Sequence, residues 1–586
     1  MTYIIGLNTY HGDSSACLLH EGKLLAAAEE ERFCRRKHYA GFPSDAIAYC
    51  LREGGVSLRN IDYIAINSDP KANLWKKAKY ALTHRVDLNL IKKRLEISNK
   101  RRSVIDILTD SYGKEEVRFS VRYVEHHLAH LSSAFHVSPY ENATILSIDG
   151  LGDFASAAWG TGEKDKITIK GKVLFPHSLG IFYQSLTKFL GFPHYGDEYK
   201  VMGLAPYGEP AYMEEMRQIV QLLDDGTFRL NLDFFWHHRE SVEYKWENGV
   251  PVAGRLFNDN LGRLLGLAPR TPGGELTRAH KDLARSIQVM YEEAFFHLLK
   301  SLHRTYESDT LCLAGGCAMN SVANGKIALN TPYRKIYIQS AAGDAGGAIG
   351  AAFQVWHQLK GKSGARFFMD HAYWGPSYRQ EYIAAILDAR REELSSQECL
   401  AQIIENENDL CEMAAEALAN GKVVGWFQGR MEWGPRALGN RSILADPRRS
   451  DMKDILNLKI KHRETFRPFA PSILRDDVAE WFEQDDSVPF MTKVFQIRNE
   501  KREQIPAVAH VDGSGRLQTV FRETNPRFYL LIESFKRITG VPVLLNTSFN
   551  DNEPIVCRPE EALACFLRTK MDILVLGNCL ITRVQP

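Results

Sequence analysis

The sequence lacks a long apolar run, a closely spaced cysteine pair and an excess of charge of either sign. No stretch of about eighteen uncharged apolar residues occurs, which excludes a predicted membrane-spanning helix. The N-terminal residues 1–6 have neither a basic flank nor a long apolar core, so no signal peptide is expected. The ten cysteines include no CxxC pair, and we expect reduced thiols in a cytoplasmic protein rather than a disulfide framework.

The charge balance excludes a general attraction to polyanions. Lys plus Arg is 73 and Asp plus Glu is 72, so we expect neither a nucleic acid nor a membrane as a partner. With 44% hydrophobic and 25% charged residues, the composition is that of an ordinary globular protein. The length predicts two to four domains. A polar stretch around residues 360–366 places the main boundary there, giving domains 1–360 and 361–586.

Two histidines followed by an acid form the first candidate site. His126 and His130 are four residues apart, so on a helix their imidazoles share one face. An apolar run leads to Asp149, and a strand carrying it to the same place would complete a two-histidine, one-carboxylate metal site. Asp344 lies on a later strand-to-helix turn and is a natural fourth ligand. The alternative is that both histidines are ordinary residues of a helix surface.

Short apolar runs that end in glycine-rich turns predict the fold class. Residues 3–6, 310–314 and 336–339 read as buried strands, and helical periodicity covers residues 279–302. Repeated strand, glycine turn and helix units predict an α/β layered fold with its site at the carboxyl ends of strands. The polar turn at residues 8–15 suits a phosphate or a substrate, although an ordinary hairpin turn explains it equally well.

Residues 71–102 contain a cluster of lysine and arginine with Leu and Ile at helical spacing. We interpret the segment as an amphipathic pair of surface helices rather than a nucleic-acid patch, because the chain as a whole is neutral.

The second half of the sequence has a different basic pattern. Within forty positions, basic residues stand among glycine, proline and aromatic residues, and those of interest are Arg430, Arg436, Arg441, Lys461, Arg463 and Arg467. A solvated helix would space its bases among acids and alanines. Bases held by small, rigid residues instead predict a pocket for phosphate or carboxylate groups.

Taken together, these motifs resemble the NodU/CmcH-type O-carbamoyltransferase family over nearly the whole chain. The matching segments are residues 11–16, 29–33, 126–130, 200–204, 315–320, 434–442, 466–471 and 546–550. The resemblance implies an N-terminal domain of the actin/Hsp70-like (ASKHA) superfamily and a YrdC-like C-terminal α/β domain. In this family the C-terminal domain joins carbamoyl phosphate to ATP, giving carbamoyl adenylate and pyrophosphate. The N-terminal domain then passes the carbamoyl group to a hydroxyl and releases AMP.

The resemblance also implies roles for individual residues. The metal ligands would be His126, His130, Asp149 and Asp344, with iron(II) or another divalent transition metal as the expected ion. The carbamoyl phosphate contacts would be Arg436, Lys461, Arg467, Arg516, Asn546 and Ser548, with Lys461 and Arg467 also serving catalysis. Gly316 and Asn320 would line the nucleotide, and Mg²⁺ would accompany ATP. The acceptor hydroxyl is a poor nucleophile near neutral pH, so a base is needed to take its proton. His11 is the candidate for this general base.

The expected partners are therefore ATP, carbamoyl phosphate and a small-molecule hydroxyl acceptor such as a sugar or another specialised metabolite, and a homodimer is possible. Two alternatives stay open. The carbamoyl group could move to a nucleoside of tRNA, or the chain could be a metal-dependent nucleotide-binding regulator without enzymatic activity. The neutral net charge argues against a tRNA acceptor. The basic pattern of the second half argues against a regulator without enzymatic activity.

Overall fold

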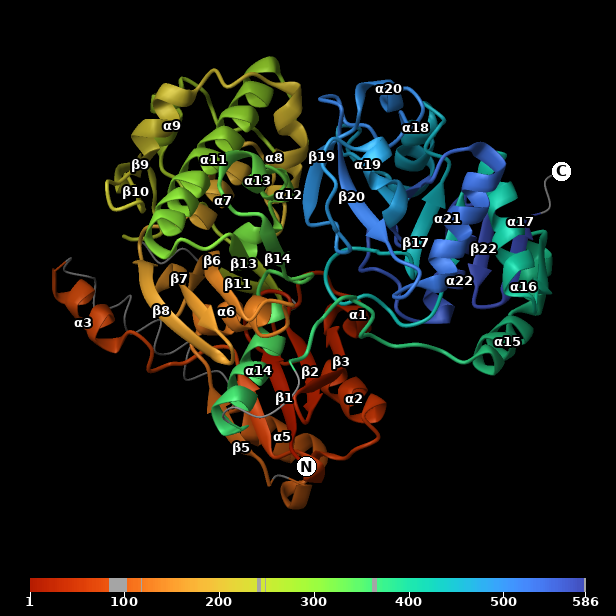
Figure 1. Ribbon diagram of the computed structural model, residues 1–586, viewed down its shortest axis with the longest axis horizontal. Coiled ribbons are helices and arrows are strands. Elements are labelled where there is room, and N and C mark those ends of the chain that lie inside the picture. Colours follow the sequence, from red (N-terminus) through yellow and green to blue (C-terminus); the bar gives the residue numbers. More distant parts are fainter. Residues whose placement is uncertain (84–102, 117, 240–243, 248, 361–365, 584–586) are drawn as a thin grey trace. The chain divides into compact units, whose positions relative to one another are not determined.

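The computed structural model describes the chain except for residues 84–102, 117, 240–243, 248, 361–365 and 584–586 (Figure 1). The chain divides into two compact units. Unit 1 contains residues 1–30, 38–319 and 327–368, and unit 2 contains residues 31–37, 320–326 and 369–586. Two short segments from the N-terminal half of the sequence thus belong to unit 2, which the sequence pattern did not indicate.

Unit 1 contains two five-stranded sheets with the same topology. In the first, the strand order is β3-β2-β1-β4-β5, and in the second it is β14-β13-β6-β7-β8. The strands of the first sheet are β1 (Tyr3–Asn8), β2 (Ser15–His20), β3 (Lys23–Glu29), β4 (Tyr63–Ile66) and β5 (Ser120–Tyr123). Those of the second are β6 (Asn142–Gly152), β7 (Ala155–Glu163), β8 (Lys166–Leu174), β13 (Thr310–Ala314) and β14 (Lys335–Ile338).

Each sheet begins with three antiparallel strands and adds two parallel ones beside its first strand. This duplicated arrangement confirms the predicted actin/Hsp70-like α/β fold. The predicted strands at residues 3–6, 310–314 and 336–339 are present, within one or two residues at their ends. The predicted helix at 279–302 is part of α11 (Arg278–Tyr306).

Burial explains why these segments read as near-continuous apolar runs. Strand β13 is buried along its whole length, as expected for a parallel strand that is covered on both faces. Helices α6 (His126–Phe135) and α14 (Gly346–Lys360) pack closely against each other within unit 1. A Cβ atom on Gly350 would lie 1.8 Å from the carbonyl oxygen of Ala129, so this close packing requires glycine.

Unit 2 is built on one nine-stranded mixed sheet in the order β15-β23-β22-β16-β17-β21-β18-β20-β19. Its strands are β15 (Cys399–Ile403), β16 (Val424–Phe427), β17 (Arg441–Ala445), β18 (Ala470–Leu474), β19 (Lys493–Gln496), β20 (Ser514–Val520), β21 (Val543–Ser548), β22 (Ile573–Leu576) and β23 (Cys579–Arg583). Helices α17 (Glu407–Ala419), α21 (Pro526–Thr539) and α22 (Pro559–Arg568) contribute to one hydrophobic core with the sheet. The unit is α/β as predicted, and its specific likeness to YrdC stays a prediction.

The predicted basic helix pair falls only partly within the described residues. Helix α3 (Leu74–Thr83) is present, and the remainder of that prediction, residues 84–102, lies outside them. In the part of the chain that the structure describes, no helix has both the length and the apolar character needed to cross a lipid bilayer.

Candidate functional site

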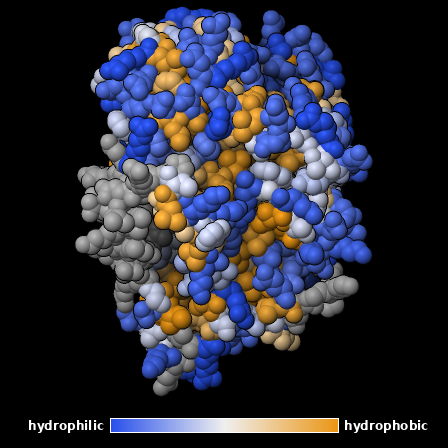
Figure 2. Space-filling view, turned by 90° about the vertical axis from the view of Figure 1, so that its left-hand side faces the viewer, coloured by the Kyte–Doolittle hydropathy of each residue, from blue (hydrophilic) through white to orange (hydrophobic). Residues whose placement is uncertain are grey.

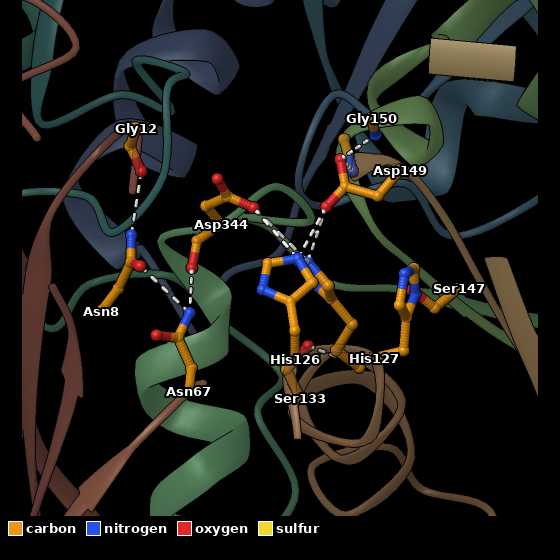
Figure 3. A network of polar contacts seen from close by, with 12 residues as sticks. Asn8, Gly12, Asn67, His126, His127, Ser133, Ser147, Asp149, Gly150 and Asp344 are labelled. Atoms are coloured by element: carbon orange, nitrogen blue, oxygen red, sulfur yellow. Dashed lines mark hydrogen bonds and ion pairs between the residues drawn. The ribbon is translucent and has the colours of Figure 1, made fainter. Parts of the chain in front are cut away.

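Four side chains of unit 1 converge as the sequence predicted. His126, His130, Asp149 and Asp344 each point one ligand atom to a common place, and these atoms all lie within 4.8 Å of one another. Figure 3 labels His126, Asp149 and Asp344 of this cluster. The Nε2 atoms of the two histidines are 3.1 Å apart. Asp149 Oδ2 lies 3.1 Å from Nε2 of His126 and 2.9 Å from that of His130. Asp344 Oδ1 is 3.6 and 3.5 Å from the same two nitrogens.

Helix α6 holds both histidines in the interior. His126 and His130 are 1% and 0% exposed, so the alternative of two ordinary surface histidines is wrong. The N-terminus of the helix is capped by Glu125, whose carboxylate accepts the backbone N–H of Leu128 at 3.0 Å. A Cβ atom at Gly152 would lie 2.0 Å from the His126 ring, so glycine lets the turn after Asp149 approach that histidine.

Asp149 is oriented by backbone donors. Its Oδ1 atom accepts the N–H groups of Gly150 at 2.7 Å and Gly316 at 3.1 Å, which leaves Oδ2 facing the two histidines. The glycine turn at residue 316 thus donates a backbone hydrogen bond to the Asp149 carboxylate. Such outer contacts fix the direction of a metal-ligating group.

The electrostatics of this cluster are those of a site built for a cation. Burial lowers the pKa of His130, but hydrogen bonds and charges from Asp149 and Asp344 outweigh burial and raise it to about 9. Burial and the charge of Asp149 raise the pKa of Asp344. Two nitrogens that face each other at 3.1 Å beside two carboxylates would be satisfied together by one divalent cation. Two imidazoles and two carboxylates are a donor set suited to a transition metal.

His11 lies beside this cluster. Its ring centroid is 5.3 Å from that of His126, and the side chain is only partly buried. The turn that carries it has left-handed backbone at Tyr10, with φ of 62°, and at Asp13, with φ of 56°. This conformation is uncommon for residues other than glycine and is held here by surrounding hydrogen bonds.

Two asparagines connect the His11 turn to the loop of Asp344. The Asn8 amide nitrogen donates to the carbonyl oxygens of Gly12 and Asp13, both at 2.9 Å. The Asn67 amide nitrogen donates to Asn8 Oδ1 at 3.0 Å and lies 3.5 Å from the carbonyl oxygen of Asp344 (Figure 3). Both side chains are fully buried. Composition and spacing gave no signal for this pair, because the two residues are far apart in the sequence, Asn8 at the end of β1 and Asn67 directly after β4.

The second predicted site lies in unit 2, around Lys461. This lysine is 3% exposed, and its ammonium group donates to the carbonyl oxygen of Ser548 and, at 2.8 Å, to both the carbonyl and side-chain oxygens of Asn550. Burial and the charge of Arg463 lower its pKa well below the ordinary value. The structure thus brings Lys461 and Ser548 together as predicted and adds Asn550, which closes the same Asn546–Asn550 motif.

Arg463 and Arg467 lie close enough to Lys461 for their charges to lower its pKa, and both also act on Arg516. Burial and the neighbouring charges of Arg436, Arg463 and Arg467 lower the pKa of the Arg516 guanidinium well below its usual range. Arg467 also lies 3.5 Å from Glu464, a long ion pair. Cations held near one another in a partly desolvated site repel, and an anion between them relieves that cost. The cluster is therefore suited to a phosphate-bearing ligand.

Asn546 offers an acceptor that no residue of the described chain uses. Its amide nitrogen donates to Ser472 Oγ at 3.0 Å and Gln518 Oε1 at 3.1 Å. Its Oδ1 atom is buried without a hydrogen-bond partner among the described residues. A buried polar atom left unpaired is costly, so a ligand that donates an N–H group here is favoured.

Two arginines of the predicted basic pocket donate hydrogen bonds to the backbone. Arg441 is fully buried, donates to the carbonyl oxygens of Asn440 at 2.9 Å and Pro376 at 3.0 Å, and stacks over the Phe427 ring. Arg430 donates to the carbonyl oxygen of Trp374 at 2.7 Å. Both guanidinium groups thus contact backbone carbonyl oxygens, as the Lys461 ammonium group does, and the role of both arginines as anion ligands stays a prediction.

Glu432 organises the loop that carries Arg436. One carboxylate oxygen accepts three backbone N–H groups, from Leu438 at 2.7 Å, Asn440 at 2.8 Å and Arg441 at 3.1 Å. The side chain is 3% exposed. Sequence analysis missed this residue, since a single acid in a glycine-rich basic loop is not distinguishable from a surface charge.

The predicted nucleotide residues belong to different units. Gly316 lies in unit 1 against Asp149, as described above, and Asn320 lies in the segment of unit 2. Asn320 caps helix α12 (Ser321–Gly325) by accepting the N–H of Ala323 at 3.0 Å. Their role in binding a nucleotide stays a prediction.

Comparison with known families and proteins adds independent information. The family model described as carbamoyltransferase N-terminus matches residues 3–353, and that described as carbamoyltransferase C-terminus matches residues 415–583. An uncharacterized protein of Synechocystis sp. is 40% identical over 621 residues, covering 100% of this chain and 98% of the relative. Nodulation protein NolNO of Sinorhizobium fredii is 40% identical over 98% of this chain and 80% of its own length. Nodulation protein U of Bradyrhizobium diazoefficiens is 27% identical over 93% of this chain and 92% of its own.

Solved structures with a partial likeness include T. kodakarensis HypF, at 16% identity and a TM-score of 0.29, covering 62% of this chain and 48% of that one. The Acidaminococcus fermentans (R)-2-hydroxyglutaryl-CoA dehydratase component A has 13% identity and a TM-score of 0.32, covering 61% of this chain and 99% of that one. Scores this low support no argument about this chain.

Proposed function

We infer, because the chain belongs to the carbamoyltransferase family and is an enzyme of that class, that it catalyses ATP-dependent O-carbamoyl transfer in two half-reactions. The cationic cluster of the buried Lys461 and partly buried arginines is the observation that carries this proposal. Unit 2 would form carbamoyl adenylate there, and unit 1 would transfer the carbamoyl group to a hydroxyl. The proposed acceptor is a small molecule.

The first half-reaction explains the residue types in unit 2. For the atoms to balance, carbamoyl phosphate and water release inorganic phosphate, and the resulting carbamate oxygen attacks the α-phosphorus of ATP, from which pyrophosphate leaves. Two anions must meet in this step, so cations are needed to reduce their repulsion and to stabilise the charge of the transition state. Arg436, Lys461, Arg467 and Arg516 would supply them. The free Oδ1 of Asn546 would accept an N–H of the carbamoyl amide, and Ser548 would orient the same group.

The second half-reaction fits the geometry of unit 1. The acceptor hydroxyl loses its proton as its oxygen attacks the carbamoyl carbon, and the bond to the phosphate of AMP breaks. His11 is the proposed base, since it lies next to the four-residue cluster and is partly accessible. His126, His130, Asp149 and Asp344 would hold the proposed iron(II), which when bound supplies Lewis acidity toward an oxygen of the adenylate. Mg²⁺ would bind with ATP.

The test is an assay with the full chain, ATP, Mg²⁺ and carbamoyl phosphate in the absence of an acceptor. We expect pyrophosphate release that depends on carbamoyl phosphate, together with carbamoyl adenylate detected by mass spectrometry. Lys461→Ala should abolish release, whereas Lys422→Ala, at a partly exposed lysine that pairs with Asp572, should not. Release that Lys461→Ala leaves unchanged would contradict the assignment of the pocket. Release without carbamoyl phosphate would contradict the proposed reaction.

A further inference from the structure

Helix α3 presents an unusual surface for a helix of a globular protein. Its apolar residues Leu74, Trp75 and Leu82 are 55%, 80% and 81% exposed, and no residue of the helix is buried. Single exposed apolar residues are normal on a protein surface. Three large ones on a helix of ten residues are a local concentration that needs an explanation.

The helix is attached to unit 1 by its other side. The Tyr80 ring packs edge to face on Phe154 and Phe175, with centroids 5.8 and 5.2 Å away. Just before the helix, the Asn73 side chain donates to the carbonyl oxygen of Asp153 at 2.8 Å. Aromatic packing and a hydrogen bond hold α3 against unit 1. The exposure of Leu74, Trp75 and Leu82 is therefore not explained by a helix that lacks contacts with the rest of the unit.

Helical geometry places the apolar residues on one stripe. Leu74, Ala78 and Leu82 follow at intervals of four residues, and Trp75 lies three before Ala78 and seven before Leu82, so the four share a face. Tyr80 points to a different side. Within α3 the usual orientation of an amphipathic helix, with its apolar stripe toward the protein core, is thus reversed.

Positive charge accompanies this stripe. Lys71, Lys76 and Lys79 are exposed, and residues 70–83 contain no acid. The neutral net charge of the chain therefore conceals a local basic surface. Figure 2 shows the side of the molecule on which α3 lies, at the left of Figure 1, and hydrophobic and hydrophilic side chains lie next to each other there.

We propose that α3 binds the surface of an anionic lipid bilayer. Leu74, Trp75 and Leu82 would enter the interface between headgroups and acyl chains, and Lys76 and Lys79 would contact lipid phosphates. Tryptophan prefers this interface because its ring is apolar and carries one polar N–H group. A nucleic acid would use the lysines but would leave the two leucines in water, so the apolar stripe favours lipid. This attachment differs from a membrane-spanning segment and revises the expectation of no membrane partner.

The anchored helix is linked to the candidate metal centre. Asp153 Oδ2 accepts the backbone N–H of Asp69 at 2.8 Å and that of His126 at 2.9 Å. Asp153 and Phe154 both have left-handed backbone, with φ of 47° and 71°, in the turn between β6 and β7. Lipid binding at α3 therefore holds the membrane surface next to the turn that follows Asp149. The binding itself does not depend on the carbamoyl transfer proposed above.

Vesicle flotation of the full chain tests the proposal. We expect the protein to float with vesicles of phosphatidylcholine mixed with phosphatidylglycerol, not with phosphatidylcholine alone, and less at high salt. Trp75→Ala/Leu82→Ala should lose flotation, and Lys76→Gln/Lys79→Gln should bind about tenfold more weakly or worse. The matched controls are Leu329→Ala, at a leucine of unit 1 that is 69% exposed, and Lys335→Gln, both of which should float as the parent does.

Circular dichroism of each variant checks that it folds, which is expected because the changed side chains are exposed. Absence of flotation with the anionic vesicles would overturn the proposal. So would equal flotation of the parent and of Trp75→Ala/Leu82→Ala. Binding of duplex DNA or tRNA that needs the lysines but not Trp75 and Leu82 would assign the surface to nucleic acid instead.

Discussion

The rings of His11 and His126 lie with their centroids 5.3 Å apart and their planes inclined at 37°. This contact joins a residue of the first turn of the chain to a residue of the four-residue cluster, more than a hundred positions later. It places a group that can take a proton beside the proposed metal ligands, within one compact unit.

Replacing His11 tests its role as the base. His11→Ala should lower carbamoyl transfer to an accepted hydroxyl compound by roughly 10²–10⁴-fold, the usual contribution of a positioned base. Pyrophosphate release should stay at the parent rate, because the first half-reaction uses unit 2. The histidine His20, which stacks on Tyr3 elsewhere in unit 1, provides the control His20→Ala. Transfer by His11→Ala at the full rate would show that another group takes the proton.

Removing one histidine of the cluster should remove the metal. His130→Ala leaves three of the four ligand atoms. We expect the affinity for iron(II) to fall more than about a hundredfold, because mutating a residue that only hydrogen-bonds to a metal ligand already lowers metal affinity by up to about that factor. Elemental analysis of the purified protein measures metal per chain. His357→Ala changes a half-buried histidine of unit 1 outside the cluster and should keep the parent's metal content. If His130→Ala kept the metal content of the parent, the ligand assignment would be ruled out.

The asparagine pair should matter for transfer but not for metal binding. Asn8→Ala removes two buried hydrogen bonds to the turn that carries His11 and should cost about 1–3 kcal/mol of stability. The turn contains two left-handed residues and needs these bonds, so transfer should slow more than pyrophosphate release does. Asn67→Ala removes the donor to Asn8 Oδ1 and should have the same effect in weaker form. A loss of metal with unchanged transfer would contradict this role.

Glu432 should act on the binding of carbamoyl phosphate through the loop of Arg436. Glu432→Ala leaves three backbone N–H groups without their acceptor, so the loop should lose its fixed conformation. We expect the KM for carbamoyl phosphate to rise at least about tenfold, and Glu432→Gln, which keeps one acceptor oxygen, to recover part of the loss. Glu412→Ala, at an exposed carboxylate of the same unit that pairs with Arg537, controls for removal of an acidic side chain. An unchanged KM in Glu432→Ala would show that the loop does not depend on this residue.

What the sequence revealed of the site follows from local spacing. His126 and His130 were predictable because a helix places residues four apart on one face, and Asp149 because an apolar strand leads to it. The arginines were harder to assign. Arg436 and Arg441 read alike in sequence, yet only tertiary contacts show that Arg441 is occupied by the carbonyl oxygens of Asn440 and Pro376.

The features that sequence analysis missed depend on long-range contacts. Asn8 and Asn67 meet only because β1 and β4 are adjacent parallel strands, with Leu7 opposite Ile66. The division of the chain into units shows the same limit. Residues 320–326 were assigned to the N-terminal half by their position in the sequence, but Asn324 donates to the carbonyl oxygen of Thr492 at 3.0 Å in unit 2. No local pattern encodes such a pairing.

Glu30 should make the stability of the chain depend on pH. It is 4% exposed, and its carboxylate accepts the backbone N–H groups of Asp45 at 3.2 Å and Ala46 at 2.8 Å. Burial raises its pKa from 4.5 to about 7, although the two N–H groups act in the opposite direction. The folded chain therefore holds this proton more tightly than the unfolded chain does. Its contribution is fully present below about pH 4.5 and is lost as the pH rises through about 7.

The loss amounts to on the order of 3 kcal/mol, since one pKa unit corresponds to about 1.4 kcal/mol. Glu30→Gln has no proton to lose, so urea unfolding of this variant should lack that part of the pH dependence. The exposed Glu53 on helix α2 (Ser44–Glu53) offers the control Glu53→Gln, which should follow the parent curve. The informative quantity is the difference in unfolding free energy between parent and variant, because other buried groups titrate in both. A difference that stays constant between pH 5 and 8 would show that Glu30 does not change its protonation there.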